Sequence, residues 1–500
     1  MSTEHLLPLV VALPLGAAFL IPLASLIWEK FAGILAVVTN AVLVLLTVKM
    51  IGTEPVIYSV GGWHPPFGIC LVGDPLSHIF LLTITVVSFL ITVYSISYMK
   101  RYTAGAKYYC LLMLMISGMN GVVVSGDLFN IYVFLEIAAI SSYALVAFGI
   151  EHEELEASFK YLVLGGLGSS FILFGIALMY SITGTLNLAD IALCLTKLNS
   201  ELIVKFISAL FLMGFGLKAA LVPFHAWLPD AHPSAPAPVS AMLSGLLIKA
   251  LGVYCIIRIL FNIIGFDHSY SFILIFLGLL SMVIGALLAA GQFDFKRLLA
   301  YSSISQIGYI VFAFGLGTPL GIIGGLLHLI NHSFFKSLLF LCSGAVEYAT
   351  GTRDLRQLGG LWRKMPFTAA TCSIASLSIS AIPPFGGFFS KLIIIIAAIK
   401  AADSIGPIAY LYVSIIVFVS FITLLYFVKV QKMALFGSLP EKLEKVREVP
   451  VSMWSVMVVM AVICIALGIA CPWVISNLVG PAQDVLSGKS EYIIRVLGSL

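Results

Sequence analysis

The residues of this sequence that are most able to do chemistry are ionisable side chains that interrupt long apolar segments. Glu136 lies in the middle of the apolar segment 128–150. A charged carboxylate at the centre of a membrane-spanning helix costs about 2.5–3.5 kcal/mol on insertion scales. Bases occupy similar places in or beside other apolar segments: Lys218, Lys249, His328, His332, Lys336 and Lys391. One acid and several bases within a hydrocarbon layer favour a relay for protons or cations over a site for an organic substrate.

Glu136 and Lys218 are the acid and the base with the clearest potential role. Lys218 follows the small-residue stretch MGFG (213–216) and precedes a proline-rich break. A lysine in this place cannot easily extend to the membrane surface, and a buried lysine can accept and release a proton. We therefore predict that both residues take part in ion transfer. The alternative for Glu136 is a neutral carboxyl group that only makes hydrogen bonds inside a helix bundle.

The next bases continue this pattern along the chain. Lys249 lies deep in the apolar stretch LSGLLIKALGVY (243–254). His328, His332 and Lys336 recur at every fourth residue, so on a helix they would share one face over about 12 Å. An HxxxH pair can also bind a metal, but no acidic or cysteine partner lies near it in the sequence, so we expect no metal site. Lys336 has the alternative of extending to the cytoplasmic surface.

Three further polar residues flank the proline-rich turn that follows Lys218. They are His225, Asp230 and His232. These side chains could gate the access of cytoplasmic protons to the relay. They could equally cap the ends of helices, and the sequence leaves both interpretations open.

The composition places these residues in a polytopic membrane protein. The chain is 61% hydrophobic and 10% charged, and its mean hydropathy is +1.10. A spanning helix needs about 20 apolar residues, and about 14 segments qualify: 5–27, 31–52, 74–98, 109–126, 128–150, 157–181, 203–222, 234–260, 270–291, 299–316, 320–345, 367–401, 405–430 and 451–475. The segments do not alternate polar and apolar residues as barrel strands do. We predict an all-α fold with about 14 transmembrane helices in a single domain, 1–500.

Two of the helices must be interrupted. Five prolines follow Lys218 closely, and a second break lies in IPPFGGFFSKL (382–392), just ahead of Lys391. Proline removes a backbone donor and clashes with the preceding turn. Broken helices at corresponding places of two halves are typical of inverted repeats with an ion site near the membrane midplane. We predict such repeats at approximately 109–260 and 270–430, and Lys391 as a further relay residue.

The rest of the chain is arranged around these repeats. Helices within 5–98 precede them and a helix at 451–475 follows. Residues 54–73 should form a small hairpin outside the membrane, whereas 182–202 and 346–366 should be plain connectors. Lys and Arg are more frequent in the connectors on one side, which predicts that both termini lie outside the cell membrane.

Several kinds of chemistry lack support in the sequence. It contains no P-loop, no GxGxxG motif after a strand and no CxxC spacing among its eight cysteines. No cluster of bases is dense enough to indicate nucleic acid. We therefore expect no cofactor and no redox centre in this chain.

Five longer motifs carry a resemblance to a known family. They are GGWHPPFGICLVGDPLS (61–77), GDLFNIYVFLEIAAISSYALVAFG (126–149), GLKAALVPFHAWLPDAHPSAPAPVSAMLSG (216–245), HLINHSFFKSLLFLCSG (328–344) and IPPFGGFFSKL (382–392). These segments resemble the antiporter-like subunits shared by respiratory complex I, Mrp-type cation/proton antiporters and membrane-bound hydrogenases. The pattern looks most like the D-type subunit of the Mrp antiporters. The resemblance implies 14 helices, with inverted five-helix repeats at helices four to eight and nine to thirteen.

The resemblance also implies roles for the ionisable residues. In this family a glutamate on helix five pairs with a lysine on broken helix seven, and these match Glu136 and Lys218. The relay continues through positions that match Lys249, His328, His332 and Lys391. The resemblance thus implies a proton-translocating subunit of a multisubunit Mrp-type Na⁺/H⁺ antiporter, with hydrophobic partner subunits.

Two other functions remain open on the sequence. The chain could be an ion-pumping membrane subunit of a redox-driven complex linked to NADH or ferredoxin, with the redox centres in partner chains. It could also be a solitary solute carrier, although a run of bases over four helices fits a relay better. Whether Na⁺ passes through this chain does not follow from its sequence.

Overall fold

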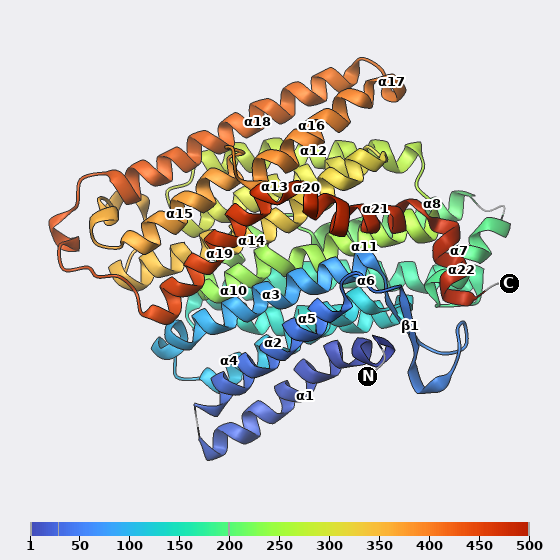
Figure 1. Cartoon of the computed structure of the whole chain (residues 1–500), viewed down its shortest axis with the longest axis horizontal. Coiled ribbons are helices and arrows are strands. Elements are labelled where there is room, and N and C mark those ends of the chain that lie inside the picture. Colours follow the sequence, from blue (N-terminus) through green and yellow to red (C-terminus); the bar gives the residue numbers. More distant parts are fainter. Residues whose placement is uncertain (1–2, 29, 199–200, 499–500) are drawn as a thin grey trace.

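The computed structural model describes residues 3–28, 30–198 and 201–498, and these residues form an elongated bundle of helices (Figure 1). Twelve helical segments of this described part are long and apolar enough to cross a membrane. Eleven of them are α1 (Leu6–Ile27), α2 (Phe31–Met50), α3 (Pro75–Tyr98), α4 (Gly105–Val124), α5 (Leu128–Val146), α6 (His152–Thr183), α12 (His268–Ala290), α13 (Phe295–Gly315), α14 (Pro319–Thr350), α18 (Ile408–Val430) and α19 (Val451–Ile469). The polytopic all-α prediction is confirmed.

The twelfth segment, Ala237–Ile264, changes its helical type along its length. It comprises α10 (Ala237–Met242), the π-helical turns η4 (Leu243–Leu247) and η5 (Lys249–Val253), α11 (Tyr254–Ile257) and the π-helical η6 (Arg258–Ile264). This segment, α13 and α14 are buried along nearly their whole length and form the centre of the bundle.

Two further passes are broken, as the prolines predict. The first consists of α8 (Glu201–Lys218) and α9 (Leu228–Ser234), and the second of α15 (Pro366–Ile379) and α16 (Gly386–Lys400). Neither broken pass is among the twelve segments, so the number of 14 stays a prediction. Glu4 and Val496 line one cavity, so both described ends of the chain lie at the same end of the bundle and the number of crossings is even.

The connectors follow the predictions in part. The hairpin forms from β1 (Val56–Ser59) and β2 (Cys70–Gly73), which pair antiparallel. The plain connector expected at 182–202 is wrong, because it contains the helix α7 (Leu188–Lys197). The side chain of Asn187 accepts the amides of Ala189 and Asp190 and so begins this helix. Its ten residues are too few for a strong signal in the sequence.

The remaining elements are short. They are η1 (Thr3–His5), η2 (Val60–Gly62), η3 (Met99–Arg101), η7 (Leu355–Gln357), η8 (Leu361–Arg363), α17 (Ala402–Ile405), η9 (Gln431–Phe436), η10 (Glu441–Leu443), α20 (Cys471–Val474), η11 (Ile475–Val479), α21 (Gly480–Ser487) and α22 (Lys489–Leu497). α20 lies within the predicted final helix, 451–475, and the last three elements continue the chain beyond it. The connector expected at 346–366 begins inside α14 and then carries η7 and η8.

One backbone arrangement occurs twice in the bundle. The Leu128 amide donates to the Leu186 carbonyl at 2.8 Å, and the Phe295 amide donates to the Arg353 carbonyl at 3.0 Å. In both cases the bond joins the start of a helix, α5 or α13, to the turn after a 32-residue helix, α6 or α14. In the turn after α6, the Asn187 side chain donates to Sγ of Cys70, just before α3 begins. The turn after α14 shares a cavity with Tyr98, where α3 ends.

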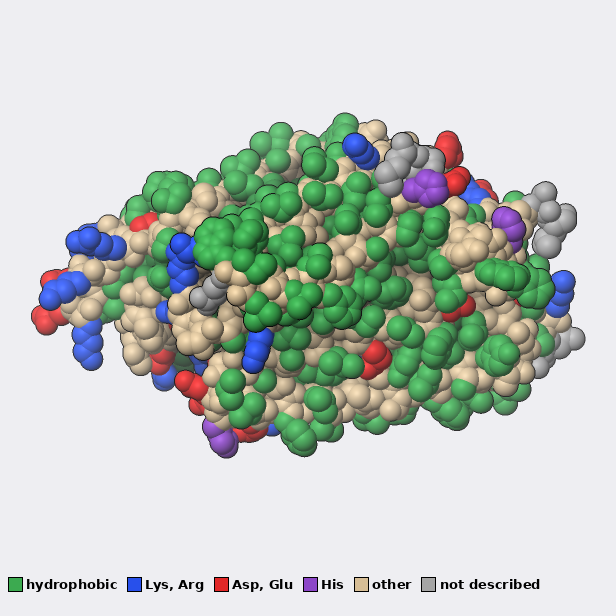
Figure 2. All heavy atoms as spheres, turned by 90° about the horizontal axis from the view of Figure 1, so that it is seen from below, with side chains coloured by type: hydrophobic (Ala, Val, Ile, Leu, Met, Phe, Trp, Pro, Cys, Tyr) green, Lys and Arg blue, Asp and Glu red, His purple; other side chains and the backbone are tan. Residues whose placement is uncertain are grey.

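The two matching turns therefore lie at opposite ends of the bundle, which is the relation that inverted repeats require. The recurrence supports the predicted repeat, while its boundaries at 109–260 and 270–430 remain a prediction. Hydrophobic side chains cover most of the face in Figure 2, and Lys, Arg, Asp and Glu gather toward the two ends of the molecule. This distribution suits a bilayer around the middle of the bundle.

Candidate functional site

The two broken passes have the same backbone geometry. Ala220 and Ala381 both have positive φ, 56° and 60°. One residue later, the Leu221 amide donates to the Gly216 carbonyl and the Ile382 amide to the Leu377 carbonyl, which ends each half-helix in the same way. The end of a half-helix leaves carbonyl oxygens unpaired and carries partial negative charge. Each break therefore offers a favourable place for a cation inside the bundle.

Lys218 occupies this place at the first break. It is the last residue of α8, and its Nζ lies 3.7 Å from Oε1 of Glu136 on α5. The ammonium also donates to the hydroxyl of Tyr143 at 3.2 Å. Lys218 is buried, whereas the Glu136 side chain is 25% exposed on the surface of the bundle. The structure thus brings the predicted acid and base into contact at the edge of the chain.

Two residues of this site were missed in the sequence. The Ser169 hydroxyl on α6 donates to the same Glu136 oxygen that faces Lys218. Tyr143 lies two helical turns after Glu136, so its spacing of seven residues could have placed both on one face. Ser169 is a neutral side chain on another helix and gave no such signal.

Lys249 lies further inside the bundle, and its hydrogen bonds to described residues go to backbone carbonyls. Its Nζ donates to the carbonyls of Ser244 at 2.9 Å and Gly245 at 2.5 Å. Both carbonyls belong to the π-helical turn η4, and wide turns of this kind are frequent at functional sites. Lys249 is 2% exposed, so its charge depends on these carbonyl dipoles.

The predicted stripe on α14 is buried along its whole length. His328 Nε2 pairs with Gln306 at 3.1 Å and its Nδ1 with Ser390 at 2.9 Å. The ring of His332 lies 6.4 Å from that of His328, and neither of its nitrogens has a hydrogen-bond partner in the described part of the chain. Lys336 donates to the Ser302 hydroxyl on α13. Its complete burial excludes the alternative of extension to the cytoplasmic surface.

Lys391 reaches back across the second break. Its Nζ donates to the Ile379 carbonyl at 3.0 Å, at the end of α15, and lies 4.6 Å from the centre of the Tyr309 ring. Its neighbour Ser390 makes the bond to His328. The second break is therefore joined directly to the histidine stripe of α14.

The three residues of the proline-rich turn separate into different environments. Asp230 forms ion pairs with Lys160 at 3.1 Å and Arg297 at 3.4 Å on the surface. His225 is half-buried, and its Nδ1 has no partner in the residues that the structure describes. His232 is completely buried against the ring of Phe340 at 4.6 Å.

Chemically, this arrangement is a line of buried proton-binding groups. One acid and one lysine stand at its first end, and amines and imidazoles follow through α14 to the second break. Protein side chains and carbonyls hold each group, and no described hydrogen bond or ion pair joins Lys249 to its neighbours on either side. Transfer along this line would need water between the groups.

Family models match most of the chain. A model described as "NADH:quinone oxidoreductase/Mrp antiporter, TM" matches residues 125–423. A second, described as "NADH-Ubiquinone oxidoreductase (complex I), chain 5 N-terminus", matches residues 57–109. The first match alone contains every predicted relay residue.

Two curated relatives are similar over nearly their full length. The N-type subunit of the NADH-quinone oxidoreductase of Desulforudis audaxviator is 34% identical and covers 95% of this chain and 98% of the relative. The D-type subunit of the Na(+)/H(+) antiporter of Alkalihalophilus pseudofirmus is also 34% identical and covers 87% of this chain and 88% of the relative.

Solved structures show the same fold and complete the comparison. A chain of the Mrp complex from Dietzia sp. superposes with a TM-score of 0.89 at 29% identity, with all of both chains covered. A chain of the membrane-bound sulfane sulfur reductase, an archaeal respiratory membrane complex, gives 0.90 at 34% identity, over 98% of this chain and 99% of that one. The chain belongs to the family of antiporter-like membrane subunits that NADH:quinone oxidoreductase and the Mrp antiporters share.

Proposed function

We propose that this chain is the proton-translocating D-type subunit of a multisubunit Mrp-type Na⁺/H⁺ antiporter in the cell membrane, with both termini outside. The observation that carries the proposal is the contact of Glu136 with Lys218 at the first break, from which buried bases continue to the second break. The similarity to the Na(+)/H(+) antiporter of Alkalihalophilus pseudofirmus and to the Mrp complex supports the same assignment.

The proposed mechanism is a coupled titration of neighbouring buried groups. When Glu136 binds a proton, Lys218 loses the negative charge at 3.7 Å and releases its own proton more readily. That proton then moves through water toward Lys249, the α14 stripe and Lys391. Asp230, His225 and His232 would regulate access from the cytoplasm. The protein supplies positions and dipoles, and no redox step takes place in this chain.

A second candidate is the ion-pumping subunit of a redox-driven complex. The 34% identity to an NADH-quinone oxidoreductase chain and to the sulfane sulfur reductase chain favours it. Purification in mild detergent separates the candidates. Hydrophobic partner subunits without iron–sulfur proteins would support the antiporter, whereas co-purifying iron–sulfur subunits would support the redox-driven complex.

The proton relay itself is tested in membrane vesicles that contain the complete complex. Lys218→Ala and Glu136→Gln should abolish proton transport while the protein remains inserted and assembled. Full transport by both variants would overturn the proposal. Lys205→Ala is the matched control, because Lys205 lies on the same helix but pairs with Glu201 on the exposed surface.

A further inference from the structure

A cavity of about 520 Å³ opens at the end of the bundle opposite to Glu4 and Val496. It lies between the connector after α3, the connector between α5 and α6, the end of α9 and the turn after α14. Its charged wall includes Arg101, Glu153, Glu154, Lys296, Glu347 and Arg353. A water molecule takes about 30 Å³ of liquid, so the cavity has room for several waters beside these charges.

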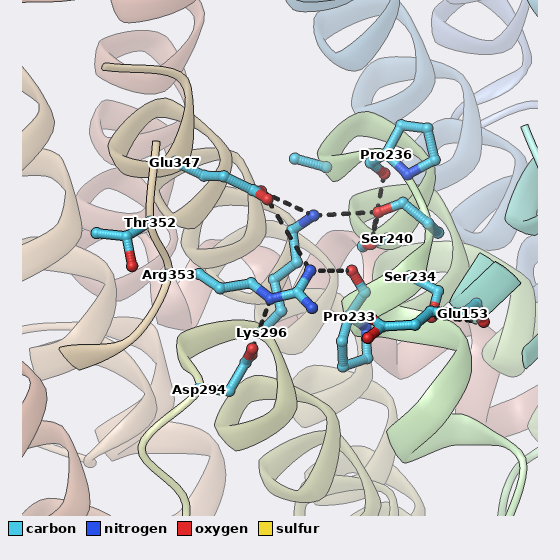
Figure 3. Close-up of polar contacts among 12 residues, drawn as sticks. Glu153, Pro233, Ser234, Pro236, Ser240, Asp294, Lys296, Glu347, Thr352 and Arg353 are labelled. Carbon is cyan, nitrogen blue, oxygen red and sulfur yellow. Dashed lines mark hydrogen bonds and ion pairs between the residues drawn. The ribbon is translucent and has the colours of Figure 1, made fainter. Parts of the chain in front are cut away.

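Lys296 and Arg353, two cationic side chains of the second half, bind the backbone at residues 233–235, which forms the floor of this cavity. Lys296 is buried, forms an ion pair with Glu347 Oε2 at 3.0 Å and donates to the Ala235 carbonyl at 3.1 Å. Arg353 donates to Asp294 at 2.5 Å and to the Pro233 carbonyl at 2.6 Å. Figure 3 shows Lys296 and Arg353 between Glu347, Asp294 and the chain at Pro233. The floor is thus the end of the first broken pass, fixed by side chains from α13 and from the turn after α14.

His232 lies directly behind this floor, one residue before Pro233. It is completely buried, and neither ring nitrogen has a hydrogen-bond partner among the described residues. An imidazole in such a place loses its hydration without compensation from the protein. Its ring packs 4.6 Å from that of Phe340, and the Lys336 ammonium lies 5.8 Å from the same Phe340 ring. His232 therefore adjoins the cavity through Pro233 and shares the Phe340 ring with the buried lysine of α14.

We propose that this cavity is a proton-loading vestibule for the second half of the chain, in which Glu347 binds the proton and His232 passes it to Lys336. The carboxylate of Glu347 takes a proton from a hydronium ion and leaves water. Through water, that proton moves to one nitrogen of the neutral His232 ring, and the other nitrogen releases its own proton to the Lys336 amine. No electron is transferred. Glu347 and Lys336 return to their first states when Lys336 passes the proton on, whereas His232 is left neutral in its other tautomer and regains the first one by rotation of its ring. The inference rests on the proposed transport function.

The first test measures proton uptake by everted vesicles that contain the complete complex. His232→Gln and Glu347→Gln remove the two proton-binding groups with little change of volume. Each should lower uptake by about 100-fold or more, the range that positioned acids and bases contribute. His64→Gln and Glu444→Gln, at exposed positions outside the vestibule, are the controls and should keep full uptake. Full uptake by both vestibule variants would overturn the inference.

A second measurement does not depend on these buried substitutions. Ala104 lines the cavity wall, and Ala104→Cys places a thiol there that a membrane-impermeant maleimide can reach from one side only. Labelling from that side should lower uptake relative to the parent chain treated in the same way. Unchanged uptake after complete labelling would overturn the inference. If Lys218→Ala stops transport but the vestibule variants do not, the vestibule alone is wrong. If Lys218→Ala transports normally, the proposed function is wrong.

Discussion

The two halves of the bundle have residues of different charge at corresponding positions. Ser169 and Lys336 occupy the same place in the 32-residue helices α6 and α14. Each bonds to the preceding helix, Ser169 to Glu136 and Lys336 to Ser302. The first half therefore has an acid with a neutral partner, whereas the second half has a base with a neutral partner. The corresponding helix–helix contact therefore contains a negative charge in the first half and a positive charge in the second half.

A similar exchange occurs at the breaks. The rings of Tyr143 on α5 and Tyr309 on α13 each face the ammonium group of a lysine in the following broken pass. The distance from Nζ to the ring centre is 5.9 Å for Lys218 and Tyr143, and 4.6 Å for Lys391 and Tyr309. Only Lys218 has a carboxylate beside it. The described contacts of the second-half relay bases Lys336, Lys391 and His328 contain no such counter-ion. We infer that the first half holds charge in an ion pair and that the second half passes protons between groups that are stable when neutral.

The largest effect is expected when a carboxylate is introduced beside a relay base of the second half. Ser302→Glu would place a carboxylate beside Lys336, and a buried ion pair resists the removal of either charge. We expect proton uptake to fall by about 100-fold or more. Ser302→Ala, which removes the hydrogen bond without adding a charge, should have a smaller effect. Equal uptake by the two variants would contradict the comparison.

Removal of the neutral partner in the first half should have the next largest effect. Ser169→Ala deletes a hydrogen bond to the Glu136 carboxylate, and bonds to charged groups contribute about 1.5–3 kcal/mol. We expect about a tenfold loss of proton uptake. Ser170→Ala is a matched control, because the neighbouring hydroxyl is exposed and bonds only to the Gly166 carbonyl. A similar loss in both variants would indicate a general defect of α6.

The two tyrosines should differ when their hydroxyls are removed. Tyr143→Phe deletes a direct bond to Lys218 and should lower uptake about fivefold, since a net hydrogen bond is worth about 1 kcal/mol. Tyr309→Phe keeps the ring under Lys391, because its hydroxyl bonds instead to Ile416 and Ser420. Its uptake should stay close to that of the parent. A larger loss in Tyr309→Phe would reverse the assignment.

The smallest effect is expected from a substitution at the position where the turns after α6 and α14 have different residues. Asn187 begins α7, and Asp354 occupies the corresponding place at η7. The hydrogen bond from Arg356 holds the pKa of the Asp354 carboxyl below its ordinary value. A lowered native pKa stabilises the fold above the unfolded pKa of about 3.9, and this stabilisation is lost as pH falls through the native pKa.

Asp354→Asn should therefore lower the melting temperature of the purified complex slightly at neutral pH. This difference should shrink on acidification, and proton uptake at neutral pH should not change. A melting temperature difference that grows as the pH falls would contradict the sign of this effect.

The sequence predicted the parts of this molecule that follow from hydropathy and backbone chemistry. Apolar length located the spanning helices, and proline located both breaks within a few residues of Ala220 and Ala381. The burial of Lys218 and Lys391 followed from the same segments, whereas the sequence left Lys336 open between burial and extension to the surface.

The contacts within the candidate site were less accessible to sequence reasoning. Ser169 and Ser302 are neutral residues whose role depends on a neighbour on another helix. The vestibule likewise depends on how Lys296 and Glu347 meet the end of α9. The match of Ser169 with Lys336 involves different residue types, so only the helix lengths and contacts reveal it.

The central claim is that the Glu136–Lys218 pair is required for proton movement through this chain. The most direct measurement compares proton uptake by vesicles that contain the complete complex with Lys218→Ala or with Lys205→Ala, at equal amounts of assembled complex. The account predicts that Lys218→Ala abolishes uptake and that Lys205→Ala leaves it unchanged. Full uptake by Lys218→Ala would contradict the account.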